Sequence, residues 1–437
     1  MGGAIHPPIF SVVMAREKLI VENFASITAL ELELRSINVL IGKQAVGKSV
    51  CIKLVYFFKQ FIWQMLESAE NQEDKRGFDR TCLEQFTQLF PYYTWEKTQF
   101  RVRYEIADLY IELSGDERSK KPKFSYSEQY RKEFQAIRKY WAAQYQSLDF
   151  SDFTGAPNAL KFDIAQRFIQ QFPQEARFSQ LFIPSGRSFF SLLQKNIFSF
   201  LSSKNEIDPL LTQFGVVYER LKFLYVKEGF LGKDAMPKEI QELTEKILRG
   251  RYIYDGEDDR LLAQDGRVIH VLHSSSGQQE ALPLVVILPA LLRIQGLGHG
   301  KAIYIEEPEA HIFPDSQKSI IELIATVYNS NQEGLSQEGY QFFITTHSPY
   351  ILTAFNNLLQ AGELHSSLKG KHLQKKLNKI VPKSRSLSYQ DMTVYSLENG
   401  TAINIMSEEL GLIDTNIIDN VSNQMSIEFG NLLDLAE

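Results

Sequence analysis

The chain has 437 residues, of which 44% are hydrophobic and 23% are charged. This length allows about two or three domains, and the composition is that of a folded chain with a large core, which excludes a disordered or collagen-like protein. Acidic residues (53) outnumber basic ones (47), and the formal net charge of −6 excludes a polycation that coats nucleic acid or an anionic membrane.

Cysteine usage and hydropathy indicate a cytoplasmic protein without a membrane span. Two cysteines, Cys51 and Cys82, are too few for a disulfide framework or a four-ligand zinc site. The longest apolar run, residues 281–292, includes Pro283 and Pro289 and is about a dozen residues long, whereas a spanning helix needs about 20.

The first part of the chain predicts strands followed by a buried helix. The segments LIVENF and ALELEL alternate apolar and polar residues, and INVLI, which ends at Ile41, is continuously apolar like a buried strand. From Val50 to Glu67, apolar residues at helical spacing on nearly every turn predict one buried helix. The strands QFRVRYEI and LYIELS and an amphipathic helix over residues 127–148 follow.

The middle of the chain is mainly helical in pattern and contains one short apolar strand, LFIPSGR. The α/β pattern resumes with RYIYDG and GRVIHVL, a helix over residues 279–293, the strand AIYIEE, a helix after Pro314 and the strand QFFITT. We therefore expect an α/β core in two parts, residues 1–114 and 251–362. A helical lobe, residues 115–250, is inserted between them, and a basic linker and tail, residues 363–437, follow.

The segment GKQAVGKS fits the pattern G-x-x-x-x-G-K-[ST] of a phosphate-binding loop (P-loop) and lies between a predicted buried strand and a predicted helix. Its glycines let successive N–H groups face phosphate oxygens at a helix N-terminus. Lys48 is expected to reach the β- and γ-phosphates, and the Ser49 hydroxyl to bind Mg²⁺. The nucleotide-binding residues predicted here are Gly42, Lys43, Gln44, Ala45, Val46, Gly47, Lys48, Ser49 and Val50.

Two apolar strands end in residues that suit the chemistry of such a loop. AIYIEE ends in two carboxylates, of which we assign Glu306 to Mg²⁺ and Glu307 to general base catalysis on the attacking water. QFFITT is followed by His347, whose imidazole can bond the γ-phosphate or that water. The predicted catalytic residues are Glu307, His347 and Lys48, and the predicted metal ligands are Ser49 and Glu306.

A fourth segment, SSSGQQ at residues 274–279 (the signature segment), opens a predicted helix and offers hydroxyls and N–H groups as a second anion site. In the order GKQAVGKS, SSSGQQ, IYIEEPEAHIFP, ITTHSP, the four segments resemble the ABC-type ATPase heads, and more closely the SMC/RecF-like and OLD-family ATPases. The resemblance covers residues 18–60 and 265–360 and the segment FIPSGR. It implies an α/β P-loop NTPase fold of the ABC-type head, a mixed sheet core with flanking helices that carries an inserted, mainly helical lobe, and it implies hydrolysis of ATP with Mg²⁺.

The resemblance also implies a site shared between two chains. In that family the signature segment of one chain caps the nucleotide on the P-loop of another, within a homodimer or a higher oligomer. The residues carried over to this role are Ser275, Ser276, Gly277 and Gln278. The sequence departs from the family at Glu306, where most ABC proteins have aspartate, and at Ser276, where transporters have glycine. Arg187 in FIPSGR is either a coupling residue or a salt-bridge partner, and no Q-loop glutamine is assigned.

Several roles remain open for such an ATPase. The lobe is too large for a transporter subunit, and the residues after Ser348 hold no Asp-x-Asp pair of the kind an OLD-type nuclease needs. An SMC/RecF-like DNA-repair ATPase is the alternative, although the helix over residues 127–148 is too short for an SMC rod. The favoured role is a regulatory or sensor subunit of a bacterial anti-phage complex. It is similar in architecture to the ATPase of the PARIS system and would control a separate effector, a Toprim or other nuclease.

One stretch of the tail is strongly basic and holds no acidic residue. Its cations are Lys369, Lys371, Lys375, Lys376, Lys379, Lys383 and Arg385. Two interpretations stay open: a solvated loop, or a surface that holds a polyanion such as DNA or a phage protein that mimics DNA.

Overall fold

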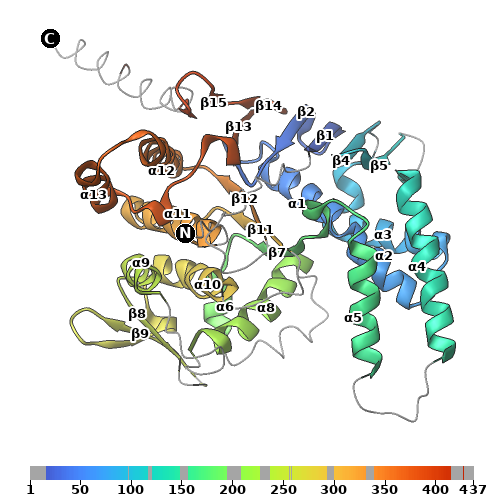
Figure 1. The fold of residues 1–437 in the computed structure, drawn as a ribbon, viewed down its shortest axis with the longest axis horizontal. Coiled ribbons are helices and arrows are strands. Elements are labelled where there is room, and N and C mark those ends of the chain that lie inside the picture. The colour runs from blue at the N-terminus through green and yellow to red at the C-terminus, as the bar shows by residue number, and fades with distance from the viewer. Residues whose placement is uncertain are drawn as a thin grey trace, which may run out of the picture.

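A six-stranded, mostly parallel sheet forms the centre of the computed structural model (Figure 1), which describes residues 16–96, 98–116, 121–147, 156–193, 208–226, 237–254, 256, 258–292, 300–330, 339–414 and 427. The strand order is β14-β13-β3-β12-β11-β7, and only β14 runs antiparallel to its neighbour. Every residue of β3, β11 and β12 is buried, which is why these segments are continuously apolar in the sequence. The bounds are β3 (Ile37–Ile41), β7 (Ser179–Ile183), β11 (Lys301–Glu306), β12 (Tyr340–Thr346), β13 (Met392–Glu398) and β14 (Thr401–Asn404).

A second, antiparallel sheet has the order β2-β1-β4-β5-β6. Burial alternates along β4 and β5, as expected for strands with one face on the core. The strands predicted from LIVENF, ALELEL, QFRVRYEI and LYIELS are confirmed. The bounds are β1 (Glu17–Phe24), β2 (Ile27–Leu34), β4 (Arg101–Ile106), β5 (Leu109–Ser114) and β6 (Lys123–Tyr126).

The single helix predicted from Val50 to Glu67 is two helices in the structure, α1 (Lys48–Lys59) and α2 (Phe61–Glu70). Gln60 lies between the two helices, and its backbone N–H donates to the carbonyls of both Tyr56 and Phe57. Both helices contact α3 (Lys75–Leu89), but their other partners differ: α1 packs on β7, β11 and β12, whereas α2 packs on α4 (Glu128–Ser147). Apolar spacing does not distinguish one long helix from two that share a buried face.

A buried polar network joins the two sheets. The Lys59 Nζ donates to Glu17 Oε1 at 2.5 Å and to Gln341 Oε1 at 2.8 Å, and the Gln341 amide donates to Glu17 Oε2 at 2.5 Å. The Tyr104 hydroxyl also donates to Glu17. The Lys59 and Glu17 side chains are 0% and 1% exposed, and removal of one partner of such a pair typically costs about 3–5 kcal/mol.

The residues predicted as an inserted lobe, 115–250, form two groups of helices and also contribute β6 and β7 to the two sheets. The first group, α4 (Glu128–Ser147) and α5 (Ala156–Ile169), lies side by side at one end of the molecule (Figure 1). The helix predicted over residues 127–148 is confirmed as α4, except that Leu148 lies outside the described residues.

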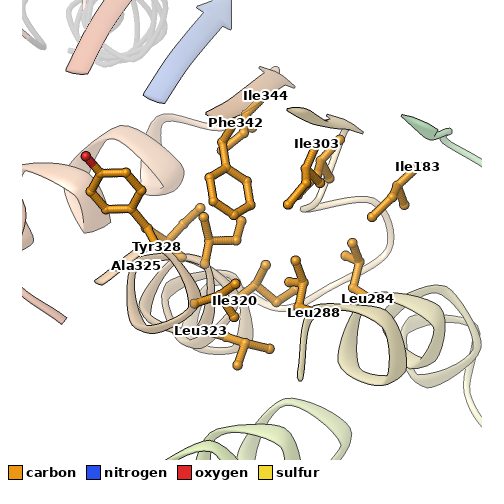
Figure 2. Packing of buried hydrophobic residues seen from close by; sticks show 14 of the residues in the cluster. Ile183, Leu284, Leu288, Ile303, Ile320, Leu323, Ala325, Tyr328, Phe342 and Ile344 are labelled. Atoms are coloured by element: carbon orange, nitrogen blue, oxygen red, sulfur yellow. The ribbon is translucent and has the colours of Figure 1, made fainter. Parts of the chain in front are cut away.

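The second group lies over one face of the central sheet. It comprises α6 (Ser188–Leu193), α8 (Pro209–Val226), α9 (Lys238–Leu248) and a sheet of β8 (Gly250–Tyr254), β9 (Asp259–Ala263) and β10 (Val268–His270). Helices α10 (Ser276–Leu291) and α11 (Pro314–Ser330) complete it. Leu284 and Leu288 of α10 point toward the sheet residues Ile183 and Ile303, and Phe342 points toward α11, whereas Leu323 lies on the side of α11 away from the sheet (Figure 2).

The range 363–437, expected as a linker and tail, contributes to the core. Its β13 pairs with β3 in the central sheet, and all but two of the seven residues of β13 are buried. The rest comprises the end of α12 (Pro349–Ser367), α13 (Lys371–Ile380), β14, β15 (Met406–Ser407) and β16 (Leu412–Ile413). Short 3-10 helices are η1 (Tyr92–Thr94), η2 (Gln174–Arg177), η3 (Val271–His273), η4 (Lys383–Arg385) and η5 (Tyr389–Asp391). In the part of the chain that the structure describes, no helix is both long and apolar enough to span a membrane.

Candidate active site

Three neighbouring parallel strands end at the same edge of the central sheet. β12 pairs with β3 on one side and with β11 on the other, and Thr345 lies opposite both Leu40 and Glu306. The loops that follow such strand ends gather side chains from distant parts of a chain. Here they bring together the P-loop, the acidic segment after β11 and the histidine after β12.

Two glycines of the P-loop are required by the backbone. Gly42 has φ 154° and Gly47 has φ 99°. A Cβ at Gly42 would lie 2.4 Å from the Leu397 carbonyl oxygen, and one at Gly47 would lie 2.8 Å from Ile27 Cγ1. The loop therefore turns tightly against β13 and β2 before α1 begins at Lys48, so the helix N-terminus faces the site.

The ammonium group of Lys48 lies at the centre of the site. Its Nζ donates to the carbonyl oxygens of Gly42 and Lys43, both at 2.8 Å, and lies 3.2 Å from His347 Nδ1. Burial lowers the pKa of Lys48 to about 8, and the charges of Glu307 and Glu309 oppose this shift. The ammonium is therefore easier to deprotonate than that of an exposed lysine.

The two adjacent carboxylates after β11 have different environments. Glu306 is buried, and its Oε2 accepts a hydrogen bond from the Ser185 N–H at 3.3 Å. The Glu307 side chain is 38% exposed, and its Oε1 lies 3.1 Å from His347 Nε2. Glu307 has φ 43°, so the chain bends just after the strand and turns the second carboxylate toward the histidine. The structure thus brings together Lys48, Glu307 and His347, which the sequence predicts as catalytic.

A third carboxylate, Glu309, was not assigned from the sequence. Its Oε1 accepts hydrogen bonds from the Thr346 hydroxyl at 2.8 Å and from the His347 N–H at 2.6 Å. These bonds fix the turn that carries the imidazole. The signal in the sequence is the third acidic residue of EEPEA, but only the fold shows that it bonds the turn after β12.

Arg187 and Glu280 form a buried ion pair next to the acidic segment, with 3.3 Å between Arg187 Nη2 and Glu280 Oε1. Arg187 therefore has a salt-bridge partner, an arrangement that is compatible with both roles that the sequence leaves open. Glu280 was not singled out in the sequence, because 93 residues separate it from Arg187.

The signature segment caps α10 within its own chain. Ser275 Oγ accepts from the Gln278 N–H at 3.3 Å, and the Ser275 N–H donates to Gln278 Oε1 at 3.1 Å, a capping box. The Gln278 amide also donates to the Leu248 carbonyl at 2.8 Å. A Cβ at Gly277 would lie 2.6 Å from the His311 carbonyl oxygen. Among the described residues, no hydrogen bond joins this segment to Lys48, Glu307 or His347.

The basic stretch of residues 369–385 is helical, not a loop. Six of its cations are exposed, on α13 or beside it: Lys369, Lys371, Lys375, Lys376, Lys379 and Lys383. Leu377, on the opposite side of α13, is buried. Arg385 lies apart from this set, because it pairs with Glu239 at 2.7 Å and with Glu322 at 3.1 Å.

A model of the AAA ATPase domain matches residues 14–352, which is most of the chain. The chain belongs to the AAA ATPase domain family. This agrees with the P-loop, the acidic strand end and the mixed sheet with flanking helices, and it confirms the predicted α/β P-loop ATPase fold. No curated protein matches this AAA ATPase.

Solved structures similar to this AAA ATPase include three SMC heads at low identity. The SMC head domain from Thermotoga maritima is 8% identical and covers 90% of this chain and 100% of its own, with a TM-score of 0.36. An SMC head bound to the C-winged helix domain of ScpA is 10% identical, with coverage of 90% and 98% and a TM-score of 0.42. An SMC head with an extended coiled coil, bound to the C-terminal domain of ScpA derived from Pyrococcus furiosus, is 11% identical, with coverage of 93% and 99% and a TM-score of 0.37.

We predict that the ATP affinity of this AAA ATPase falls as the pH rises above about 8. A bound phosphate raises the pKa of Lys48. The contribution of the ammonium to ATP affinity is therefore fully present below the pKa of Lys48 in the free protein, and it is lost as the pH rises through the pKa of Lys48 in the complex. Calorimetric ATP titrations from about pH 7 to about pH 9.5 measure this. Lys48→Arg is the control, because its guanidinium stays protonated throughout. Equal slopes for the two proteins would contradict the assignment.

Proposed function

We propose that the protein binds ATP with Mg²⁺ and hydrolyses it at the edge of the sheet where β3, β12 and β11 end. The observation that carries this proposal is the meeting of three groups from separate segments. His347 Nδ1 lies 3.2 Å from Lys48 Nζ, and His347 Nε2 lies 3.1 Å from Glu307 Oε1. In this proposal the N–H groups of residues 42–49 and Lys48 bind the phosphates, Glu307 accepts a proton from the attacking water, and His347 bonds the γ-phosphate or that water.

The residues proposed to hold Mg²⁺ fit that ion. Ser49 is exposed in the first turn of α1 and offers a hydroxyl, and Glu306 offers a carboxylate at the end of β11. Mg²⁺ prefers oxygen ligands and keeps several of them as water or substrate phosphate. Consistent with this, the described residues hold no cluster of three or more His, Cys, Asp and Glu that could bind a metal by itself. The ion, when bound, would offset the negative charge of the phosphates.

We predict that Glu307→Gln binds ATP with nearly the affinity of the parent but hydrolyses it about 100-fold or more slowly. Glutamine keeps the size and the hydrogen-bonding capacity of the side chain but does not act as a proton acceptor. Phosphate release under saturating ATP and equilibrium titration separate the two effects. Glu363→Gln, at an exposed carboxylate on α12, is the matched control and should behave as the parent. A parental hydrolysis rate in Glu307→Gln would refute the base assignment.

We propose further that two chains form composite sites in a homodimer, or in a higher oligomer built from such dimers. Ser275 and Ser276 are exposed at the N-terminus of α10, a helix of 16 residues, and a helix N-terminus favours a bound anion. The signature segment of one chain would cap the nucleotide on the P-loop of the other, and twofold symmetry would create two such sites. Gln278, whose side chain bonds Leu248 and Ser275, would hold this turn in place.

We predict that mixing Lys48→Ala with Ser276→Glu restores hydrolysis that neither variant has alone. Ser276 is the suitable position because it is exposed, whereas a side chain at Gly277 would collide with the chain's own His311 carbonyl. A carboxylate in the first turn suits the helix but repels a phosphate. In an equal mixture about half of the dimers contain one chain of each variant. Each of these mixed dimers has one intact site and one site with both defects, so about a quarter of the parental rate should return.

The control for the mixing experiment is Lys48→Ala mixed with the double variant Lys48→Ala/Ser276→Glu, in which no pairing assembles an intact site. If both single variants fold and self-associate as the parent does and their mixture stays inactive, the sites are not shared.

We propose that this ATPase cycle regulates a separate effector, such as a Toprim or other nuclease, in a bacterial anti-phage complex. The support is architectural: α4 and α5, with 20 and 14 residues, span about 30 Å and about 20 Å, which suits a docking arm better than a long rod. Phage plating with the chain and its neighbouring gene, with Lys48→Ala as the control, tests this role. Sensitivity to DNA damage on deletion, without a phage phenotype, would instead favour the SMC/RecF-like repair alternative.

The lysine face of α13, Lys371, Lys375, Lys376 and Lys379, is proposed to hold a polyanion such as duplex DNA or a phage protein that mimics DNA. These residues follow a spacing that places them on one side of the helix, opposite the buried Leu377. All four are exposed, and no ion pair with the rest of the described chain neutralises them. Their charge is therefore available to phosphates or carboxylates.

We predict that reversing Lys375, Lys376 and Lys379 to glutamate weakens duplex DNA binding and lowers its dependence on log salt by about 0.9 for each phosphate that the protein no longer neutralises. Basal ATP hydrolysis should not change. Reversal of three exposed lysines elsewhere, Lys132, Lys139 and Lys238, is the matched control for net charge. Fluorescence anisotropy at several salt concentrations measures both. Equal binding by the two triple variants would identify α13 as a solubilising helix only.

A further inference from the structure

Arg187 is the bulkiest fully buried side chain among the described residues, and it lies beside the catalytic segment. It follows β7 in the segment FIPSGR and is 0% exposed. Burial lowers the pKa of Arg187, and the charge of Glu280 opposes this shift. Burial of a guanidinium lowers the stability of the fold unless its N–H donors have hydrogen-bond partners. The partners of Arg187 therefore indicate its role.

The guanidinium of Arg187 donates hydrogen bonds to the backbone of both Glu306 and Glu307. Its Nη1 donates to the carbonyl oxygen of Glu306 at 2.6 Å and to that of Pro184 at 3.0 Å, and its Nη2 donates to the carbonyl oxygen of Glu307 at 3.0 Å. The peptide group before Glu307 has a second contact, because the Glu307 N–H donates to the carbonyl oxygen of Thr345 at 2.9 Å. The peptide groups on both sides of the Glu307 Cα are therefore fixed, at a residue whose left-handed backbone sets the direction of its side chain.

The anchor of this arrangement is Glu280 on α10. Its carboxylate accepts from the N–H groups of Arg187 at 3.1 Å and Ser188 at 2.9 Å, and its carbonyl oxygen accepts from Arg187 Nε at 3.2 Å. The Glu280 side chain is 1% exposed. Glu280 lies less than one turn after Gly277, so the helix that opens with the signature segment is joined through one ion pair to the carbonyls that orient Glu307.

We propose that Arg187 and Glu280 are positioning residues. They link α10, the helix that opens with the signature segment, to the backbone of Glu307 and so orient the carboxylate of this general base. This inference rests on the proposed hydrolysis of ATP. Lys48 and the P-loop are held by separate contacts, next to β13 and β2, so the contacts that they would make with the phosphates of ATP do not depend on the pair. Loss of the pair therefore lowers kcat and leaves the affinity for ATP nearly unchanged, because a displacement of about 1 Å at the reacting groups can cost about 100-fold in rate.

Three variants test this inference. Arg187→Lys keeps the positive charge, but a single ammonium does not reproduce the fork that reaches three carbonyl oxygens. Glu280→Gln keeps the shape but removes the charge, and Glu280→Asp keeps the charge with a shorter side chain. We expect kcat to fall about 100-fold in the first two and about 10-fold in Glu280→Asp, with the Kd for ATP within about threefold of the parent in all three.

The control is Lys222→Met, which removes the cation of a buried ion pair elsewhere in the same lobe. Lys222 and Asp259 are 3.1 Å apart, their side chains are 5% and 3% exposed, and neither contacts Glu306 or Glu307 in the described structure. Urea unfolding ranks all variants by stability, and rates are compared per folded molecule. Lys222→Met should lose stability as Glu280→Gln does but keep the parental kcat.

The outcomes separate this inference from the proposed function. If the parent binds ATP but does not hydrolyse it, the proposed function fails. If the parent hydrolyses ATP and the Arg187 and Glu280 variants do so at the same kcat, the positioning role is refuted. An equal loss of kcat in Lys222→Met, or a parallel loss of ATP affinity in the three variants, also refutes it, because general destabilisation then explains the effect. Should the two severe variants not fold, the kcat and Kd of Glu280→Asp decide the question.

Discussion

The parallel pairing of β12 with β3 and β11 is the constraint on which the site depends. Because Thr345 is level with Leu40 on one side and with Glu306 on the other, the three strands end together and their loops open at one edge. A slip of one residue in either pairing would turn every side chain of the slipped strand to the opposite face. All residues of the three strands are buried, so both faces are packed and a slip would disrupt the packing on each. Figure 2 shows one of these faces, where Ile303 and Phe342 point toward α10 and α11.

Polar networks inside the core fix the relative positions of helices and strands, which apolar packing alone leaves adjustable. Glu17, Lys59 and Gln341 join the antiparallel sheet to the beginning of β12, and Glu309 bonds the turn at its end. Buried ion pairs contribute little net stability compared with apolar residues of the same volume, but an incomplete pair is strongly disfavoured. Their effect in this chain is to define distances between elements, as Lys59 and Glu17 do between the two sheets and Arg187 and Glu280 do between α10 and the end of β11.

The sequence predicts the parts of this structure that local physics determines. The P-loop follows from its glycine spacing, and the strands of both sheets follow from alternation or from continuous apolarity. The division at Gln60 and the place of β13 beside β3 depend on which partners a segment meets, and the segment itself does not record them. Lys48, Glu307 and His347 were recognisable because their residue types and their positions after a strand are local features of the sequence. Glu280 and Glu309 were not, because their roles exist only through contacts with a distant turn. The basic stretch shows the converse, since its charge is plain in the sequence but its helix and the separate pairing of Arg385 are not.

The chain passes through the α4 and α5 pair between the edge strands of the two sheets. It leaves β6, runs along α4 and α5, and enters β7, where Trp63 of α2 braces the entry by donating to the Phe178 carbonyl at 3.1 Å. The far end of β7 leads directly to Ser185 and Arg187. The α4 and α5 pair is thus attached to the central sheet through β7, the same strand that leads to the turn where Arg187 contacts the backbone of Glu306 and Glu307. One edge strand therefore connects the outlying helices to the edge of the sheet where the P-loop, Glu307 and His347 meet.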